Sequence, residues 1–319
     1  MPEKHDSGIV IRADGTRYTL AMRALLLATT LLLPGTAMTP SAPATASRLE
    51  PLRLGRLQVW KLQDGRLSLA VSLLKGLDPA EARRMLGGRD AADTPVNAFL
   101  VRMPGHTVLV DTGMGKDPEE DSGHLEAQLA AAGVAPSDVD LILITHEHFD
   151  HIGGLLRADG SRAFPRAVLR VARREHAFWT EDPSRLPERL RDRAPKLKAL
   201  FGVYEKAGAF RPFEDGEALA PVLRAIPAPG HTGGHTVYAF TSEGQELWCI
   251  GDLIHFGAVQ FQHPEVGVAF DLDGARAVKV RQELFREAAR RKVVLAGAHL
   301  PKLVRIIPKG AGYEAVSVP

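Results

Sequence analysis

The stretch LILITHEHFDHIGGLL, residues 141–156, constrains this chain more than any other part of its sequence. A short apolar run, typical of a buried strand, ends at Thr145. His146, His148, Asp150 and His151 follow directly. Imidazoles and carboxylates packed together without a cation would leave unpaired charge and unsatisfied donors at a partly buried site. The crowding therefore favours a metal site over simple packing.

The same arrangement recurs where other predicted strands end. Apolar runs are followed by Asp111 in VLVDTG, His231 in AIPAPGH, Asp252 in LWCIGD and His299 in VVLAGAH. Rigid strands can bring such side chains to one edge of a sheet, and neighbouring glycines let the backbone approach closely. Any one of these residues alone would be an ordinary turn residue. Together with the histidine-rich stretch they predict a shared site.

The set of candidate ligands fits two divalent ions. Imidazole and carboxylate without thiolate suit zinc, which we expect first, and also manganese, iron or cobalt. Two ions about 3.5–4 Å apart can hold a hydroxide between them and clamp the oxygens of a displacement. One ion is expected to be bound by His146, His148 and His231, the other by Asp150, His151 and His299, with Asp252 bridging the two.

Strands and helices are mixed along the chain, which indicates one α/β domain over residues 47–319. We expect hairpins over 52–74, with Asp64-Gly65 as the turn, and over 97–113, around Pro104-Gly105. Helices are expected over 126–134, over parts of 184–208 broken by Pro187 and Pro195, and over 273–291. The run 293–299 is expected to be the last strand.

Residues 1–46 are interpreted as an N-terminal extension with a signal peptide. Arg23 precedes an apolar run over 24–33, and a Pro/Ala/Ser/Thr-rich stretch then ends at Ala46, so the pattern itself starts at Met22. A run of this length is too short to span a bilayer, which needs about 20 residues. We expect cleavage near Ala46, no stable membrane anchor afterwards, and a periplasmic or secreted protein. The only cysteine, Cys249, cannot form an internal disulfide.

Charge argues against a nucleic-acid partner. The formal net charge is +2, and no long basic run occurs in the 319 residues. The hydrophobic content of 45% is sufficient for a sizeable core. The arginine-rich segment 189–193 is expected to be a solvated helix face.

The motifs THEHFDH, PGHTGGHT, GDL and GAH, in this order after VDTG, resemble the metallo-β-lactamase superfamily over essentially all of residues 48–319. The resemblance implies a four-layer αββα sandwich with the metals at one edge, between the two sheets. It assigns the seven ligands as above, and it implies that Asp111 orients a metal-binding histidine. His235, in the second motif, is expected beside the site and not as a ligand.

Longer stretches, within 176–221 and 251–273, resemble the methyl parathion hydrolase branch, and more distantly the acyl-homoserine lactonases. That branch includes phosphotriesterases and relatives active on lactones and aryl esters. Asp252 speaks against a lactam substrate, because β-lactamases of this fold usually carry Cys or Ser there. Related hydrolases are often dimers, which makes a homodimer compatible with the resemblance.

The remaining site residues are assigned around the metals. Asp150 and Asp252 are the carboxylates that could relay a proton to the leaving group. His176 is expected on the surface or in the insert that carries Phe178 and Trp179. His255, in the loop after Asp252, could line the pocket, but we expect it to face solvent. An apolar pocket wall for an acyl or aryl group is expected from the aromatic residues Phe149, Phe178, Trp179, Phe256 and Phe261.

The sequence thus predicts an exported binuclear metal hydrolase acting on small lactones, aryl esters or phosphotriesters. One alternative is a thioester hydrolase of the glyoxalase II kind, against which stands the lack of an obvious cluster for the glutathione carboxylates. Another is a metal-binding or redox protein without hydrolysis; His148 opposes it, because flavo-diiron relatives carry Glu there. A nuclease of this fold would need a basic groove that the sequence does not indicate.

Overall fold

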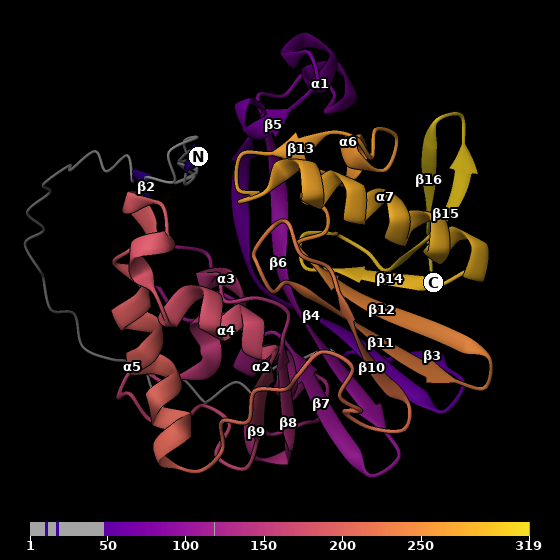
Figure 1. The fold of residues 1–319 in the computed structure, drawn as a ribbon. Coiled ribbons are helices and arrows are strands. Elements are labelled where there is room, and N and C mark those ends of the chain that lie inside the picture. The colour runs from indigo at the N-terminus through magenta and orange to yellow at the C-terminus, as the bar shows by residue number, and fades with distance from the viewer. Residues whose placement is uncertain (1–9, 12–16, 19–47, 118, 319) are drawn as a thin grey trace, which may run out of the picture.

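Two β-sheets form the centre of the molecule (Figure 1). The computed structural model describes residues 10–11, 17–18, 48–117 and 119–318. The first sheet has the order β2 (Arg17–Tyr18), β1 (Val10–Ile11), β4 (Leu57–Ala70), β6 (Ala91–Met103), β7 (His106–Val110), β8 (Leu141–Ile144) and β9 (Val168–Val171), and β3 (Leu52–Leu54) pairs with β4. The second has the order β10 (Leu223–Pro227), β11 (Thr236–Ser242), β12 (Gln245–Gly251), β14 (Val294–Gly297), β15 (Val304–Lys309) and β16 (Gly312–Ser317). A small ladder joins β5 (Leu74–Lys75) to β13 (Gly267–Val268).

Helices cover the outer face of each sheet. The first sheet carries α2 (Leu125–Ala131), α3 (Phe149–Ile152), α4 (Arg173–Thr180) and α5 (Arg193–Lys206), and α7 (Gly274–Arg291) lies across the second (Figure 1). Near the upper end in that view are α1 (Pro79–Met85) and α6 (Gly257–Gln260). Short 3-10 turns connect these elements: η1 (Val71–Leu73), η2 (Pro136–Asp138), η3 (Gly153–Leu155), η4 (Pro183–Arg185) and η5 (Glu188–Leu190).

The core follows this layering because successive side chains of a strand point to opposite faces. In β6, Leu100 packs under the helices with Phe201 of α5. Its neighbour Val101 faces the second sheet and packs with Tyr238. Phe285 of α7 belongs to a further cluster on the outer side of the second sheet. The apolar layers thus alternate with the sheets, which confirms the predicted αββα sandwich.

Parallel pairing brings the functional strand ends together. β7 pairs in parallel with β8 in the first sheet, and β12 pairs in parallel with β14 in the second. The carboxyl ends of parallel neighbours lie at the same edge of a sheet. The loops that follow these four strands therefore meet at one edge of the sandwich, where the polar residues of the sequence motifs lie.

The predicted turn at Asp64-Gly65 is wrong. β4 runs straight through it, with only a bulge between Gln63 and Gly65, and the hairpin turn lies at Gly55 and Arg56 instead. The Asp64 side chain is buried and accepts hydrogen bonds from the backbone N–H groups of Met114, Gly115 and Leu125. The aspartate that suggested a turn therefore anchors the loop that follows β7.

Two other expectations also change. Pro195 does not break a helix, because it lies in the first turn of α5, where its missing N–H leaves no intrahelical bond unmade. The strand at 294–297 is followed by the hairpin of β15 and β16 and is not the last. The predicted leader, with its apolar run over 24–33, lies outside the described residues, and export stays a prediction.

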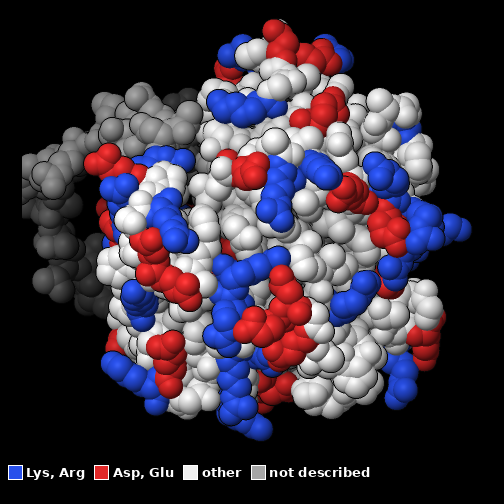
Figure 2. Space-filling view, viewed as in Figure 1, with Lys and Arg blue, Asp and Glu red and all other residues white. Residues whose placement is uncertain are grey.

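Charge is spread evenly over the described surface that Figure 2 shows, where acidic and basic side chains lie interspersed. In the described part of the chain, no helix has both the length and the apolar character needed to cross a bilayer.

The hydrogen bonds of Asp64 predict the result of one substitution. Asp64→Ala should lower the free energy of unfolding by roughly 2–4 kcal/mol, because buried N–H donors lose their acceptor. Urea denaturation followed by circular dichroism measures this. Asp93→Ala removes only an exposed partner of Arg66 and should cost less than about 1 kcal/mol. Equal effects of the two substitutions would contradict the anchoring role.

Candidate metal centre

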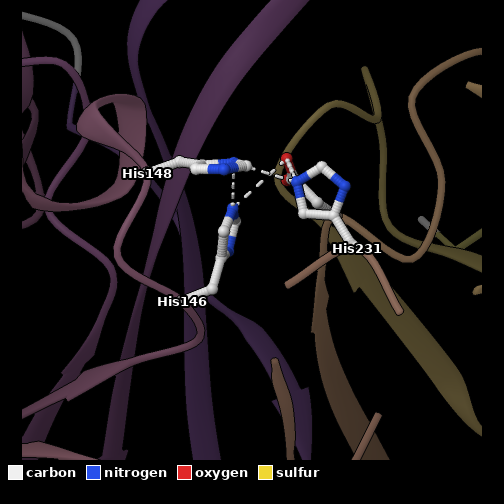
Figure 3. Close-up of side chains that lie close together, drawn as sticks. His146, His148 and His231 are labelled. Carbon is white, nitrogen blue, oxygen red and sulfur yellow. Dashed lines mark hydrogen bonds and ion pairs between the residues drawn. The ribbon is translucent and has the colours of Figure 1, made fainter. Parts of the chain in front are cut away.

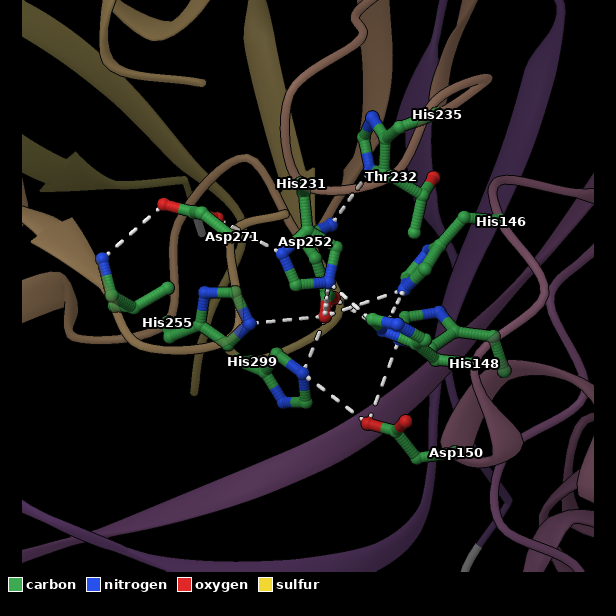
Figure 4. A network of polar contacts seen from close by, with 12 residues as sticks. His146, His148, Asp150, His231, Thr232, His235, Asp252, His255, Asp271 and His299 are labelled. Carbon is green, nitrogen blue, oxygen red and sulfur yellow. Dashed lines mark hydrogen bonds and ion pairs between the residues drawn. The ribbon is translucent and has the colours of Figure 1, made fainter. Parts of the chain in front are cut away.

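Seven side chains from both sheets converge at the shared edge (Figure 4). The first sheet contributes the loop after β8 and the short helix α3, and the second contributes the turns after β10, β12 and β14. They form two overlapping groups, and within each group the ligand atoms lie within 4.8 Å of one another. The first group is His146, His148, His231 and Asp252, and the second is Asp150, His151, His299 and Asp252.

Asp252 belongs to both groups because its two oxygens face different ways. Its Oδ2 lies 3.5 Å from Nε2 of His146 and 3.2 Å from Nε2 of His231. Its Oδ1 lies 3.0 Å from Nε2 of His151 and 3.2 Å from Nε2 of His299. One carboxylate is thus shared between two sets of imidazoles, as a bridging ligand would be.

Each group is compact. Nδ1 of His148 lies 3.0 Å from Nε2 of both His146 and His231, and the three rings point toward one another in Figure 3. In the second group, Oδ2 of Asp150 lies 3.6 Å from Nε2 of His151 and 3.5 Å from Nε2 of His299. A tetrahedral ion with bonds of about 2.0–2.1 Å separates its ligand atoms by roughly 3.3–3.4 Å. The observed spacings lie close to that value.

Two buried atoms in this cluster make no hydrogen bond: Nε2 of His151 and Oδ1 of Asp252. Leaving such atoms without a partner is costly in a buried site. Both point into the second group, where an ion would satisfy them. The residues therefore fit two divalent metal ions, one in each group.

Asp111 fixes the orientation of His151. Its Oδ2 lies 2.8 Å from Nδ1 of His151, and because a carboxylate only accepts, Nδ1 donates and Nε2 is left to bind metal. Both the backbone N–H and the hydroxyl of Thr145 donate to Asp111 at 2.8 Å. These bonds hold Asp111 in the left-handed region, at φ 60°, which is strained for a residue other than glycine. The structure thus supports the expected orienting role.

Two further ligands are oriented by groups that the sequence did not reveal. Nδ1 of His231 lies 3.0 Å from Oδ1 of Asp271, and Nδ1 of His299 lies 3.0 Å from the carbonyl oxygen of Pro95. In both cases the partner is an acceptor, so Nε2 again faces the metal group. Asp271 comes from the segment before α7, far along the chain from His231, and only the fold brings them together.

The imidazoles differ in their charge state. Burial holds the pKa of His146 well below its usual range, and the charge of His151 adds to this effect. Burial likewise lowers the pKa of His148. For His231, burial also acts to lower the pKa, but the hydrogen bonds to Asp252 and Asp271 outweigh it and raise the pKa to about 9. Two ligands of the first group are therefore held neutral, the form that binds metal.

A buried glutamate, Glu175 of α4, joins the two loops that carry the first group. Its Oε1 accepts from the backbone N–H of Glu147 at 3.0 Å and from Nε1 of Trp179 at 2.7 Å. Its Oε2 accepts from the hydroxyl of Thr232 and from the backbone N–H of Gly234, each at 2.7 Å. The loop of His146 and His148 is thereby tied to the loop of His231. Sequence reasoning missed Glu175, because three of its four partners lie far away in the chain.

His176 lies on α4 with Phe178 and Trp179 and is mostly buried, so that of its two expected positions the surface is wrong. Its Nδ1 lies 2.8 Å from Oε1 of Glu147, and its ring packs against Phe201 and Phe210. Burial raises the pKa of Glu147 to about 7, although the contact with His176 acts in the opposite direction. This pair holds the chain between two metal ligands from the outer side.

His235 lies beside the metal groups, where the sequence placed it. Its Nε2 accepts a hydrogen bond from the backbone N–H of Asp252 at 3.0 Å. Burial, helped by the charge of His231, lowers its pKa to about 3, so the ring stays neutral. Gly251 has a φ of 47°, and a Cβ there would lie 2.6 Å from Nε2 of His235. The glycine before Asp252 is needed for this close approach.

His255 is buried, contrary to the expectation that it faces solvent. Its Nε2 lies 3.0 Å from Oδ2 of Asp252, and its ring stacks on His299 at a centroid distance of 5.0 Å. His255 also lines the cavity next to the metal groups. It therefore lines the pocket, which was the less favoured of the two expectations.

A cavity of about 130 Å³ opens onto the metal groups. Of the five aromatic residues expected to line it, the structure brings only Phe149 there, with half of its surface exposed. The other parts of the wall were not foreseen. Five ligands and His255 form the floor, and the remaining lining residues are Leu67, Leu69, Arg189, Leu190, Arg193, Ala269, Phe270 and Leu272.

The other four aromatic residues lie away from this cavity, contrary to the expectation. Trp179 is fully buried under His148, at a ring distance of 5.6 Å, and Phe178 packs on Trp179. Phe256 and Phe261 are buried and line a different cavity. Large apolar rings are stabilised by complete burial, and in this fold the core offers it.

Comparison with known proteins agrees with this geometry. A sequence model of the metallo-beta-lactamase superfamily matches residues 91–299. The chain is 31% identical over 170 residues to a ribonuclease of Thermus thermophilus, covering 51% of this chain and 36% of that protein. It is 27% identical over 180 residues to an N-acyl homoserine lactonase of a Bacillus species, covering 50% of this chain and 63% of that protein. The matches thus span only about one third to two thirds of these relatives.

Solved structures cover more of the chain. The hydrolase AbOPH, of the beta-lactamase superfamily, is 26% identical with a TM-score of 0.80, covering 86% of this chain and 99% of that one. AidC, a dizinc quorum-quenching lactonase in complex with its product N-hexanoyl-homoserine, is 27% identical with a TM-score of 0.78 and the same coverage. The fold of this chain is similar to both over almost their full length.

The position of Glu175 predicts a selective loss of metal affinity. Glu175→Gln puts an amide NH2 opposite N–H or O–H donors, so the loops of the first group should shift and bind their ion about 10–100-fold more weakly. Competition with a chromophoric chelator, starting from metal-free protein, measures both binding steps. Only one of the two should weaken.

Glu181→Gln is the matched control, because Glu181 is exposed just beyond α4. It should leave both binding steps unchanged. A folded Glu175→Gln variant that binds both ions as the wild type does would contradict the positioning role.

Proposed function

The chain belongs to the metallo-β-lactamase superfamily, and from this premise we propose that it is a two-metal hydrolase that opens lactones. Asp252 carries the metal-dependent part of the proposal, because its two oxygens face two separate sets of histidines. The likeness to AidC, a dizinc lactonase, supports lactones as the substrate class. The same chemistry would also hydrolyse aryl esters and phosphotriesters, which are the next candidate substrates.

Divalent ions at this site, for which we propose zinc, would polarise a carbonyl or phosphoryl oxygen and lower the pKa of water to about 7. Residues of the chain would hold these ions and orient their ligands. Asp252 joins the two groups, while Asp111, Asp271 and the Pro95 carbonyl keep three ligand rings in one tautomer. Few rearrangements are then needed when the substrate binds.

Asp150 is the carboxylate placed to move a proton. Both carboxylates line the cavity, but the side chain of Asp150 is 18% exposed and that of Asp252 only 3%. The more exposed carboxylate is better placed to reach the oxygen that leaves when the ring opens, whereas both oxygens of Asp252 face ligand histidines. We therefore assign the proton transfer to Asp150 and the bridging role to Asp252.

The cavity suits a small ring with a longer arm. Its volume of about 130 Å³ is enough for a lactone ring above the metal ligands. Leu67 and Leu69 of β4 and the ring of Phe270 give the cavity apolar lining. An acyl or aryl arm would leave the cavity past the half-exposed Phe149.

A panel of substrates tests this function. The metal-loaded full chain is assayed on an N-acyl-homoserine lactone, an aryl-fused lactone, an aryl phosphotriester and S-lactoylglutathione. We expect the lactones to be cleaved fastest, with kcat/KM of about 10⁴ M⁻¹s⁻¹ or more. His299→Ala should abolish this activity, and His106→Ala, at an exposed hairpin position, should not change it.

Other results of this substrate panel would change or contradict the proposal. Preference for the phosphotriester or the thioester would replace lactones by that class. Negligible turnover of all four substrates by protein with two bound ions would contradict the proposed function.

A further inference from the structure

Two arginines line the cavity beside the metal ligands. Arg189 comes from η5 and Arg193 begins α5, so the two are four residues apart, and Leu190 between them lines the same cavity. The segment was expected to be a solvated face. Only part of it is, because Leu190 is buried and Arg193 is partly buried. The exposed Arg191 bonds to the carbonyl oxygens of Leu186 and Ser184.

Arg193 is held on an aromatic platform. Its guanidinium carbon lies 5.7 Å from the ring centroid of Trp179, within the range of a cation–π contact. Trp179 is itself fixed by its hydrogen bond to Glu175 and contacts the ring of His148. The positive charge of Arg193 is therefore kept close to the first metal group, and Coulomb repulsion from it contributes to the low pKa of His148, after burial and His231.

Arg189 is exposed at the cavity and forms no ion pair with any described residue. The nearby acidic side chains have other partners. Asp182 pairs with Arg185, and Asp192 pairs with Lys196 at 2.9 Å. An arginine that lines a cavity and is left without an internal partner is available to bind an anion from outside.

The acidic side chains of the cavity lining have partners other than Arg189. The two carboxylates in the lining, Asp150 and Asp252, face the ligand histidines at 3.0–3.6 Å and would be neutralised by the bound ions. The guanidinium groups come from η5 and α5, which lie far along the chain from both carboxylates. A planar guanidinium binds a carboxylate through two parallel hydrogen bonds.

We propose that the substrate is an ester or lactone with a carboxylate on its arm, and that Arg189 and Arg193 bind this carboxylate while the scissile group lies at the metal ligands. This inference rests on the proposed hydrolase function and narrows its substrate class. Arg189 and Arg193 would act as specificity residues, without a part in bond cleavage.

Two esters that differ in charge test the inference. The metal-loaded full chain is assayed on 4-acetoxybenzoate and on methyl 4-acetoxybenzoate, each corrected for its rate of hydrolysis by free hydroxide. The wild type should prefer the charged ester by about 10-fold or more in kcat/KM, mainly through KM. Arg189→Gln combined with Arg193→Gln should abolish this preference, because kcat/KM on the charged ester falls to about its value on the neutral ester.

Matched variants refine the test. Arg185 of η4 is exposed, pairs with Asp182 and does not line the cavity. Arg185→Gln should therefore keep the preference for the charged ester. Arg193→Lys keeps the charge but loses the planar group and should keep part of it. A wild type without preference, or a double variant that retains it, would overturn the inference.

Binding of the product separates this inference from the proposed function. Calorimetry compares 4-hydroxybenzoate with its methyl ester on the wild type and the double variant. Tighter binding of the carboxylate that needs both arginines supports the inference even if neither ester is hydrolysed, in which case only the hydrolase proposal fails. Equal binding by wild type and variant would mean that the carboxylate binds elsewhere, for example at the ions, and would overturn the inference.

Discussion

The shared carboxylate of Asp252 is the contact on which the rest of the site depends. Its oxygens can serve two metal groups only if both sheets end at the same edge, because one sheet supplies His146 and His151 and the other supplies His231 and His299. The parallel pairs β7–β8 and β12–β14 provide that alignment. The αββα core thus has a direct functional consequence: it sets the distance between the ligands from the first sheet and the ligands from the second.

Around this carboxylate, several locally unfavourable features of the fold orient the metal-binding side chains. Asp111 is held at a positive φ by Thr145, Glu175 is buried with four donors around it, and Gly251 allows close contact with His235. Each would be unfavourable alone. Together they fix the ligand rings and the two loops that carry the first group, which is what a preorganised metal site requires.

The sequence predicted the fold class and brought forward the seven ligand candidates, because these residues lie in short motifs directly after apolar strands. It failed where a role depends on distant partners. Asp271 acts on a ligand, and Glu175 on a ligand loop, that lies far along the chain. Asp64 looked like a turn residue because the N–H groups that donate to it, such as that of Met114, belong to a distant segment, the loop after β7. Trp179 is an aromatic residue of the core and not of the pocket, while Arg193, which resembled a solvated charge, lines the cavity. Hydropathy patterns cannot distinguish these cases, since they depend on which surface the tertiary fold presents.

The most direct test of the central claim is a metal titration of the chelator-treated, metal-free protein, with lactone hydrolysis measured after each addition of Zn²⁺. We predict no activity without metal and an increase that is complete at two ions per chain, with Asp252→Ala inactive throughout. Full activity of the metal-free protein, or saturation at one ion per chain, would contradict a centre in which Asp252 joins two metals.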